Sequence, residues 1–241
     1  MEESSESSCK GKYFCIIRHG ERLDYVDGEE KKDIVEISDP GLSKEGHRQA
    51  RVGGEYISEF CASKGAKRVK ILASPCVRTT QTAVQIAKAI GTLSVTLDNR
   101  FVEWMKKPWF LKPLDEIEIN ALGIDNFKLK YLSEEDQEVT VAYLDNHTEE
   151  LKEKYPEKMN SATNRYKDAI DEVLESAEMA DNDMVIVVTH LFGLECFSEK
   201  FHGESANKDY CATSIVEKEE EEWRLLVDCE SHWMGKEKKI N

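Results

Sequence analysis

The sequence predicts a three-layer α/β fold, in which helices cover both faces of a mostly parallel sheet. The first observation is that short apolar runs, typical of strands buried on both faces, alternate with longer segments of helical periodicity. The second is that 241 residues, of which 40% are hydrophobic and 34% charged, suit one globular domain with a sizeable core. We therefore expect a disordered tail at residues 1–12 and a single domain at residues 13–241.

The predicted strands are short runs of apolar and β-branched residues. The run 184–188 is apolar throughout and ends in Thr189 and His190, which makes it the clearest buried strand. The other runs that we assign to strands are 13–17, 69–73, 93–97, 213–217 and 223–227. The last two flank the acidic turn at residues 219–222, so we expect a hairpin at the edge of the sheet.

Helices are predicted where apolar residues recur every three to four positions between capping residues. Ser43 is a suitable N-cap for a helix that runs to about Ser63, and Gly65 can end it. A second helix spans residues 77–90 and is closed by Gly91. Two later helices are expected at residues 162–177 and 191–201.

Two stretches lack a regular pattern. Residues 25–41 are polar and contain glycine and proline, which predicts a loop. Residues 104–160 are expected to form an insertion of short helices and loops over one end of the sheet, above the functional site considered below.

The composition excludes several classes of protein. A formal net charge of −15 disfavours nucleic acid and anionic membrane surfaces as partners. No apolar run reaches the roughly 18–20 residues of a membrane span, and the acidic, serine-rich N-terminus is unlike a signal peptide. The seven cysteines include no CxxC pair, which indicates free thiols in a reducing compartment. We therefore predict a cytoplasmic protein.

Chemically active side chains follow the predicted strands, where ligands bind in open α/β sheets. Arginine forks bind phosphate oxygens, and positive charge near a histidine keeps its imidazole neutral and nucleophilic. A carboxyl with a raised pKa can protonate a leaving oxygen, and Glu103 suits this role because the neighbouring Trp104 can desolvate it. The residues that we select are Arg18 and His19 after the first strand, Arg22 just beyond them, Arg78 after the second, Glu103 after the third and His190 after the run 184–188.

The residues alone leave other interpretations open. His19 could be a structural histidine at a strand end, and His190 could cap the following helix. Arg18 and Arg78 could form surface salt bridges, and Arg22 could be a solvated loop arginine. Glu21 lies beside His19 in the sequence and could be the acid instead of Glu103. Three aromatic residues of the insertion could line a substrate entrance or form local core: Trp104, Trp109 and Phe110.

Four motifs together resemble the histidine phosphatase superfamily, also called phosphoglycerate-mutase-like. They are RHGE after the first strand, DPGLSKEGHRQA at the start of the first long helix, SPCVRTTQTA after the second strand and VVTH at the end of the late strand. Within the superfamily the closest likeness is to the phosphatase domain of the suppressor-of-T-cell-receptor-signalling (Sts) proteins, on the segments RHGERLD, FVEW and THLFGLEC. The resemblance extends over residues 13–227.

The resemblance implies a role for each candidate residue. His19 would be the nucleophile that becomes a phosphohistidine, and Glu103 would be the general acid that later activates water. The phosphate pocket would consist of Arg18, Arg22, Arg78 and His190. No metal or cofactor is expected, because a pocket rich in arginine repels cations and the sequence contains no HxH or HExxH pattern.

We therefore predict a metal-independent phosphomonoester hydrolase whose substrate is a small-molecule or peptide phosphate ester. One alternative is a phosphoglycerate-type mutase, although such mutases typically carry serine and asparagine soon after RHGE or RHGQ, where this chain has Arg22, Leu23 and Asp24. Another is a phosphate-binding module without turnover. The likeness to Sts domains is also compatible with a homodimer.

Overall fold

The computed structural model describes residues 11–107, 117–144, 148–176, 179–204 and 207–235. Most of the predicted tail, residues 1–10, lies outside the described residues, and so do Trp109 and Phe110. Lys12, which we expected in the tail, instead begins the first strand and pairs with Lys218. Because that partner is distant in the sequence, the local composition around Lys12 does not reveal the pairing.

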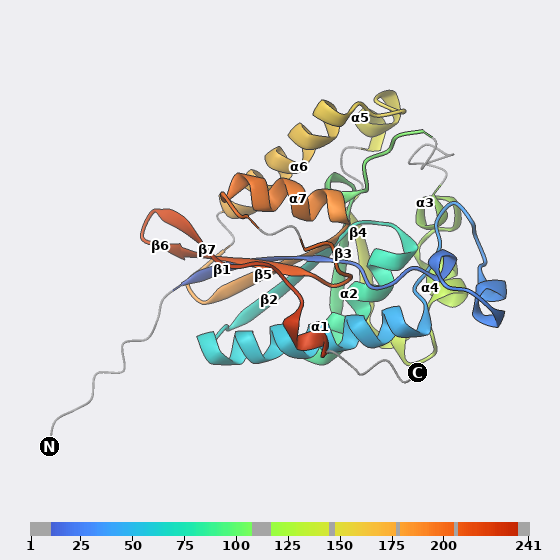
Figure 1. Cartoon of the computed structure of the whole chain (residues 1–241), viewed down its shortest axis with the longest axis horizontal. Coiled ribbons are helices and arrows are strands. Elements are labelled where there is room, and N and C mark those ends of the chain that lie inside the picture. The colour runs from blue at the N-terminus through green and yellow to red at the C-terminus, as the bar shows by residue number, and fades with distance from the viewer. Residues whose placement is uncertain (1–10, 108–116, 145–147, 177–178, 205–206, 236–241) are drawn as a thin grey trace, which may run out of the picture.

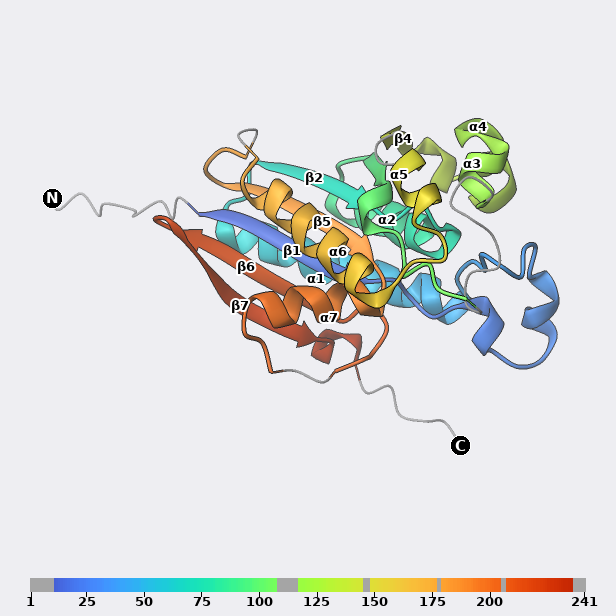
Figure 2. The same ribbon diagram turned by 90° about the horizontal axis from the view of Figure 1, so that it is seen from above.

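The described residues form one seven-stranded sheet in the order β4-β3-β2-β5-β1-β6-β7 (Figures 1 and 2). The strands are β1 (Lys12–Arg18), β2 (Arg68–Ala73), β3 (Ser94–Asp98), β4 (Thr140–Leu144), β5 (Asp183–Thr189), β6 (Thr213–Glu219) and β7 (Glu222–Glu230). Neighbouring strands from β4 to β1 are parallel, whereas β6 runs antiparallel to β1 and forms the edge hairpin with β7. The predicted fold class and the edge hairpin are confirmed.

The insertion differs from the prediction because it adds strand β4 to the sheet, with Val141 opposite Val95 of β3. Val141 is the one buried residue of β4. An edge strand with one buried side chain shows neither an apolar run nor a clear alternation, so its sequence does not predict it. The other elements in the described part of the insertion are short, as expected, and include α3 (Glu118–Leu122), α4 (Ile124–Tyr131) and α5 (Thr148–Glu153).

The long helices are α1 (Lys44–Lys64), α2 (Val77–Ile90), α6 (Met159–Leu174) and α7 (Leu191–Lys200). The bounds predicted for α1, α2 and α7 agree with the structure to within one residue at each end. Ser43 accepts a hydrogen bond from the Gly46 amide, and Gly65 and Gly91 end their helices in the left-handed conformation. The prediction of 162–177 for α6 is wrong by three residues at each end, since neither end carries a side-chain cap that the sequence could reveal.

Alternate residues of β1, an inner strand of the sheet, face two different helical layers. Cys15 and Ile17 belong to the core shared with α1 and α2, whereas Phe14 and Ile16 pack with α6 and α7. Figure 1 shows these helix pairs on opposite sides of the sheet. Because all four side chains are fully buried, the strand is apolar throughout rather than alternating.

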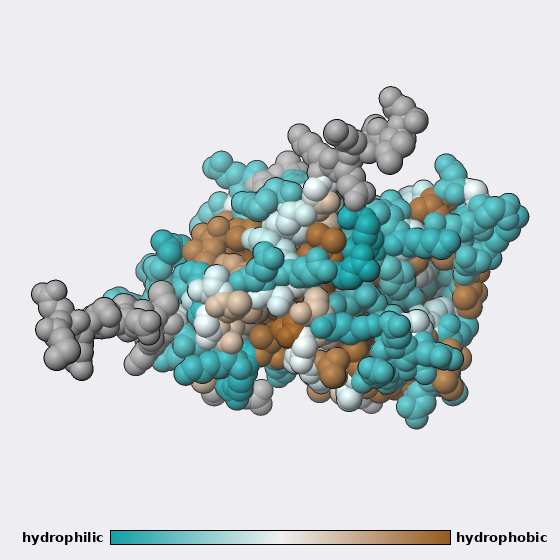
Figure 3. Space-filling model, turned by 90° about the horizontal axis from the view of Figure 1, so that it is seen from below, coloured by the Kyte–Doolittle hydropathy of each residue, from teal (hydrophilic) through white to brown (hydrophobic). Residues whose placement is uncertain are grey.

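The loop after β1 lies at the carboxyl end of that strand and includes two short 3-10 helices, Leu23–Tyr25 and Glu29–Asp33 (Figure 2). The surface in Figure 3 is mainly hydrophilic, with apolar residues in small separate groups. Among the described helices, none has both the length and the apolar character needed to cross a membrane. Six of the seven cysteines lie in the described part of the chain, where each is buried as a free thiol.

Candidate active site

His19 directly follows β1 and is 2% exposed. Its backbone amide donates to the Thr189 carbonyl at 2.9 Å, which joins the carboxyl ends of β1 and β5. Because a carbonyl only accepts, the 2.7 Å contact to Gly20 O assigns a proton to Nδ1 and leaves the lone pair on Nε2. Burial, followed by the positive charges of Arg78 and Arg18, lowers the pKa of His19 well below its usual value. His19 is therefore a neutral imidazole near pH 7.

The turn after His19 requires glycine at two positions. A Cβ atom added at Gly20 would clash with the Gly46 carbonyl oxygen, and one added at Gly46 would clash with the Glu21 carbonyl oxygen. The Gly20 amide also donates to Thr82 Oγ1 in α2 at 3.1 Å. The backbone of this turn is thus held against the first turn of α1 and against α2, which positions His19.

A cavity of about 460 Å³ opens beside His19, and Arg18, Arg22, Arg78 and Glu103 also line it. The structure therefore brings five of the six predicted site residues to one cavity. Since the parallel strands β1, β2 and β5 end at the same edge of the sheet, residues that follow different strands meet there.

Arg78, in the first turn of α2, is 3% exposed and held from two sides. Its Nη1 donates to Asp39 Oδ1 at 3.3 Å, and its Nη2 donates to His190 Nδ1 at 3.2 Å. Asp39 also accepts from the Val77 amide, and burial raises the pKa of Asp39 to about 6. Sequence reasoning missed Asp39, although it stands in the motif DPGLSKEGHRQA.

Arg18 and Arg22 line the cavity in different ways. Arg18 donates to the Lys208 carbonyl, and its guanidinium carbon lies 4.3 Å from the ring centre of Tyr210. Arg22 donates from Nε and Nη2 to the two carboxylate oxygens of Asp24, at 2.9 and 2.7 Å. Asp24 therefore orients Arg22 and occupies two of its donors, whereas Arg18 rests on a ring that sequence reasoning did not select.

Two arginine nitrogens at this site have no hydrogen-bond partner. Within the described residues, Nε of Arg18 and Nε of Arg78 are both buried without an acceptor. A buried donor without a partner costs about 1–3 kcal/mol. An anion in the cavity would offset this cost if small side-chain movements brought its oxygens to these donors.

Glu103 follows the short 3-10 helix Asn99–Phe101, which succeeds β3. One carboxylate oxygen, Oε1, accepts from the Trp104 amide at 3.0 Å, and the other, Oε2, lies 3.5 Å from His190 Nδ1. Burial raises the pKa of Glu103 above its usual value, although the charge of Arg78 opposes this shift. The carboxyl group therefore keeps its proton to a higher pH than an exposed glutamate does.

Arg165 of α6 holds the segment that carries Glu103. It is 9% exposed and forms an ion pair with Glu157 at 2.8 Å. Its Nη1 donates to the carbonyls of Arg100 and Val102 at 2.7 and 2.9 Å. This buried pair fixes the backbone just before Glu103, a function that the isolated sequence of α6 does not indicate.

His190 lies behind the cavity rather than on its lining. It is fully buried, with its ring centre 5.4 Å from that of His19. Burial, followed by the charge of Arg78, lowers its pKa well below the usual value. In its neutral form it accepts from Arg78 through Nδ1 and donates from Nε2 to Ser74 Oγ at 2.8 Å. His190 thus contacts Arg78 and Glu103, and direct contact with phosphate stays a prediction.

Two other reactive groups near the site have different roles. Glu21, the alternative acid, accepts from Ser43 Oγ at 2.7 Å and is not among the residues that line the cavity. Cys76 is fully buried, and its burial raises its pKa to about 12, so it remains a protonated thiol. Of Glu21 and Glu103, only Glu103 lines the cavity.

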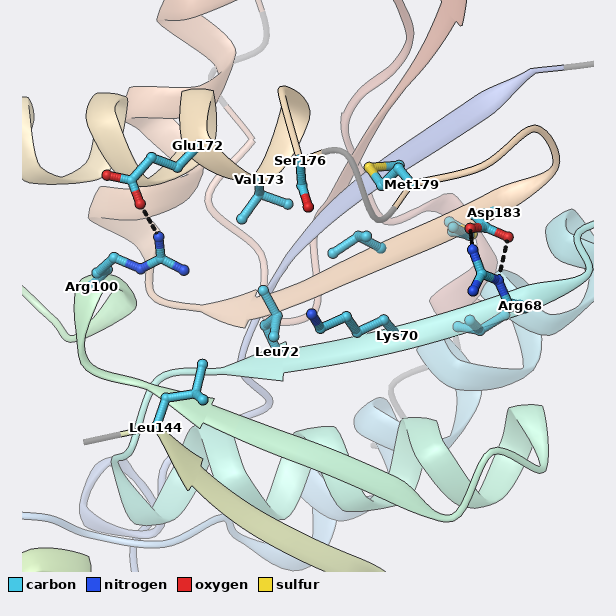
Figure 4. A pocket seen from close by; sticks show the side chains of 13 residues that line it. Arg68, Lys70, Leu72, Arg100, Leu144, Glu172, Val173, Ser176, Met179 and Asp183 are labelled. Atoms are coloured by element: carbon cyan, nitrogen blue, oxygen red, sulfur yellow. Dashed lines mark hydrogen bonds and ion pairs between the residues drawn. The ribbon is translucent and has the colours of Figure 1, made fainter. Parts of the chain in front are cut away.

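A second cavity, of about 650 Å³, lies on the sheet between β2 and α6 (Figure 4). Four of its charged side chains form ion pairs, Arg68 with Asp183 and Arg100 with Glu172. None of the predicted site residues lines it. In the described part of the chain, no three His, Cys, Asp or Glu side chains gather in an arrangement that could hold a metal ion.

The fold and the site define a class of protein: a mostly parallel α/β sheet with a histidine and three arginines around a cavity at the carboxyl ends of its strands. The chain belongs to the histidine phosphatase superfamily, because the family model for branch 1 of this superfamily matches residues 14–229. No protein with a curated description matches the sequence.

Solved structures share the fold at low sequence identity. The ecdysone phosphate phosphatase from Bombix mori has a TM-score of 0.57 and 16% identity, covering 91% of this chain and 94% of its own. The phosphoglycerate mutase from Bacillus anthracis has a TM-score of 0.57 and 14% identity, and the match covers 94% of this chain and 96% of the mutase chain. The mycobacterial glucosyl-3-phosphoglycerate phosphatase has a TM-score of 0.53 and 17% identity, and the match covers 92% of this chain and 100% of the phosphatase chain. At these identities the likeness establishes the fold alone.

Proposed function

We propose that this protein is a metal-independent phosphomonoester hydrolase that forms a phosphohistidine at His19. The observation that carries the proposal is a neutral, buried imidazole on a cavity that is also lined by three arginines and a carboxyl group of raised pKa. The histidine supplies a nucleophile, the arginines neutralise a phosphate dianion, and the carboxyl group supplies a proton.

The reaction would proceed in two steps. In the first, the Nε2 lone pair of His19 forms a bond to phosphorus while the bond to the alcohol oxygen breaks, and the proton of Glu103 goes to that oxygen. In the second, the Glu103 carboxylate takes a proton from water as the water oxygen bonds to phosphorus. The N–P bond then breaks, its electron pair returns to Nε2, and inorganic phosphate leaves. Glu103 ends protonated, ready for the next cycle.

Arg78 would contribute most to phosphate binding, because Asp39 and His190 hold its guanidinium fork in place. The transition state of phosphoryl transfer spreads negative charge over the equatorial oxygens, and fixed donors stabilise it without reorganisation. The unpartnered Nε atoms of Arg18 and Arg78 support anion binding at this position.

The Arg78→Lys variant is expected to bind inorganic phosphate about 10- to 100-fold more weakly, as measured by isothermal titration calorimetry. Lysine keeps the charge but loses the planar fork that contacts Asp39 and His190. The matched control is Arg51→Lys on the exposed side of α1, which should leave the affinity unchanged. A folded Arg78→Lys protein, checked by thermal denaturation, with wild-type phosphate affinity would contradict the role.

The segment after RHGE favours hydrolysis over a mutase reaction, in which the phosphoryl group moves between two positions of a substrate. This chain has Arg22, Leu23 and Asp24 where mutases of the superfamily typically carry serine and asparagine. Two of the structurally similar proteins are phosphatases by name and one is a mutase.

Within the superfamily we place the chain nearest to the Sts phosphatase domains, on RHGERLD, FVEW and THLFGLEC. Cytoplasmic location and a homodimer stay predictions.

The direct test is release of inorganic phosphate by the full chain in the presence of a chelator. We expect turnover of phenyl phosphate without added metal, and no interconversion of 2- and 3-phosphoglycerate. Loss of activity on chelation would contradict metal independence, and efficient interconversion would favour the mutase. A folded protein that releases no phosphate from aryl, sugar, glycerol or peptidyl phosphates would overturn the proposal.

A further inference from the structure

The cavity next to His19 is larger than a phosphate group requires. Its volume of about 460 Å³ lies within the range of roughly 300–1,000 Å³ that is usual for small-molecule sites. The polar part of the lining consists of the three arginines, His19, Glu103, Ser38 and Glu195. The remaining wall is mainly apolar and comes from Tyr25, Trp104, Met159, Leu191, Phe192 and Tyr210.

Two rings of this wall are held in place by the surrounding structure. The Trp104 indole donates from Nε1 to the Glu157 carbonyl at 2.9 Å, so its hydrogen-bond donor is already occupied. The Phe192 ring lies 5.5 Å from the Trp104 ring and 5.7 Å from the Tyr166 ring, centre to centre. Since Tyr166 is fully buried and Phe192 stands in the first turn of α7, Trp104 and Phe192 offer preformed aromatic surface rather than hydrogen bonds.

Two of the polar side chains that line the cavity, Ser38 and Glu195, contact neighbouring residues. Ser38 donates from Oγ to Glu36 at 2.7 Å, and Glu195 forms an ion pair with Lys208 at 3.5 Å. A sugar or a ribose placed against Trp104 and Phe192 would find no hydrogen-bond partner for its hydroxyl groups on these two side chains, and a polar group that loses its water without a replacement reduces affinity. The arrangement therefore disfavours sugar phosphates and nucleotides.

Two apolar side chains at the entrance are unusually exposed. Tyr25 is 67% exposed and Met159 is 50% exposed, and both line the cavity. A ligand that extends outward from the phosphate would cover them and gain apolar burial. From this wall we infer that the substrate is a small-molecule phosphate monoester of an apolar, ring-containing alcohol, whose ring lies against Trp104 and Phe192. The inference rests on the proposed function and specifies its substrate class.

The test compares two esters whose leaving groups are both primary alcohols, so that intrinsic reactivity is similar. The expected kcat/KM for 2-naphthylmethyl phosphate is at least about tenfold higher than for glycerol 3-phosphate. Equal values, or higher values for glycerol 3-phosphate, glucose 6-phosphate or AMP, would overturn the inference. A phosphotyrosyl peptide with a higher kcat/KM than phenyl phosphate would also overturn it, because contacts outside the cavity would then dominate.

Substitutions in the apolar wall test whether these side chains cause the preference for the naphthyl ester. Phe192→Ala is expected to lower the ratio of the two kcat/KM values about tenfold, with inhibition by inorganic phosphate unchanged. Phe201→Ala, at the other end of α7, is the matched control and should preserve the ratio. Met159→Glu changes a half-exposed residue, so it should fold, and it should lower the ratio too. A wild-type ratio in both cavity variants would contradict the assignment.

A binding experiment separates this inference from the proposed function. By calorimetry, 2-naphthylmethylphosphonate, which cannot be hydrolysed, should bind at least about tenfold more tightly than methylphosphonate. Equal affinities would overturn the apolar subsite even if phosphate esters were hydrolysed. Preferential binding of the naphthyl compound without any hydrolysis of esters would overturn the proposed enzyme and retain the subsite.

Discussion

Replacing His19 by asparagine is expected to lower kcat for phosphate release at least about 1,000-fold, because it removes the proposed nucleophile. The asparagine amide can still donate to the Gly20 carbonyl, so the turn after β1 keeps its hydrogen bond. The measurement is initial-rate phosphate release from phenyl phosphate by the full chain. A rate within tenfold of wild type would assign the nucleophile to another residue.

Trapping of the intermediate gives a second measure of the His19→Asn variant. Wild-type protein quenched during turnover of a ³²P-labelled ester should retain a label that is stable to alkali and lost in acid, as expected for a phosphohistidine. The variant should retain none. His232→Asn, which replaces an exposed histidine paired with Glu230, is the control and should keep both activity and label. Labelling of His19→Asn would contradict a phosphohistidine at this position.

Replacing Glu103 by glutamine is expected to lower kcat for glycerol 3-phosphate about 100- to 10,000-fold. Glutamine can still accept the Trp104 amide through its side-chain oxygen, but it supplies no proton to the leaving alcohol. 4-Nitrophenyl phosphate has a good leaving group that needs little protonation. With that ester the variant should release about one equivalent of nitrophenol in a burst, followed by slow turnover, since water activation also requires the carboxylate.

The pH profile of Glu103→Gln tests the same assignment. Because burial raises the pKa of Glu103, the wild-type rate with an alkyl phosphate should fall as the pH rises through that pKa and the acid loses its proton. The variant should lack this limb of the profile. Glu21→Gln is the matched control, since the glutamine oxygen can still accept from Ser43. If Glu21→Gln lost the limb and Glu103→Gln kept it, Glu21 would be the acid.

Much of the fold follows from patterns that are local in the sequence. The apolar runs of β1 and β5 reflect burial on both faces, and Ser43, Gly65 and Gly91 mark helix ends through their own backbone and side-chain bonds. Strand β4 was missed because hydrogen bonds to β3, not an apolar pattern, hold it at the edge. Local patterns therefore reveal elements that bury their own side chains, and they fail where a partner strand supplies the stability.

The candidate site likewise contains residues that the sequence pattern reveals and residues that it does not. Arg18, His19, Arg78, Glu103 and His190 could be selected because each follows a strand, and parallel strands end together at one edge of the sheet. Their supporting residues could not be selected by position. Asp39 reaches Arg78 from a loop, and Arg165 reaches the segment of Glu103 from α6, across contacts that leave no periodic trace in the sequence.

The sequence by itself determined the class of fold, the edge of the sheet that carries the site and the residue types that meet there, because strand ends and caps are encoded by neighbouring residues. The tertiary structure alone decided the electrostatic state of those residues. Burial lowers the pKa of His19 and raises that of Glu103, and Asp24 takes two donors of Arg22. The sequence suggested both directions, through the arginines near His19 and through Trp104 beside Glu103, but burial and ion pairing depend on atoms brought together by folding, so residue order alone does not establish them.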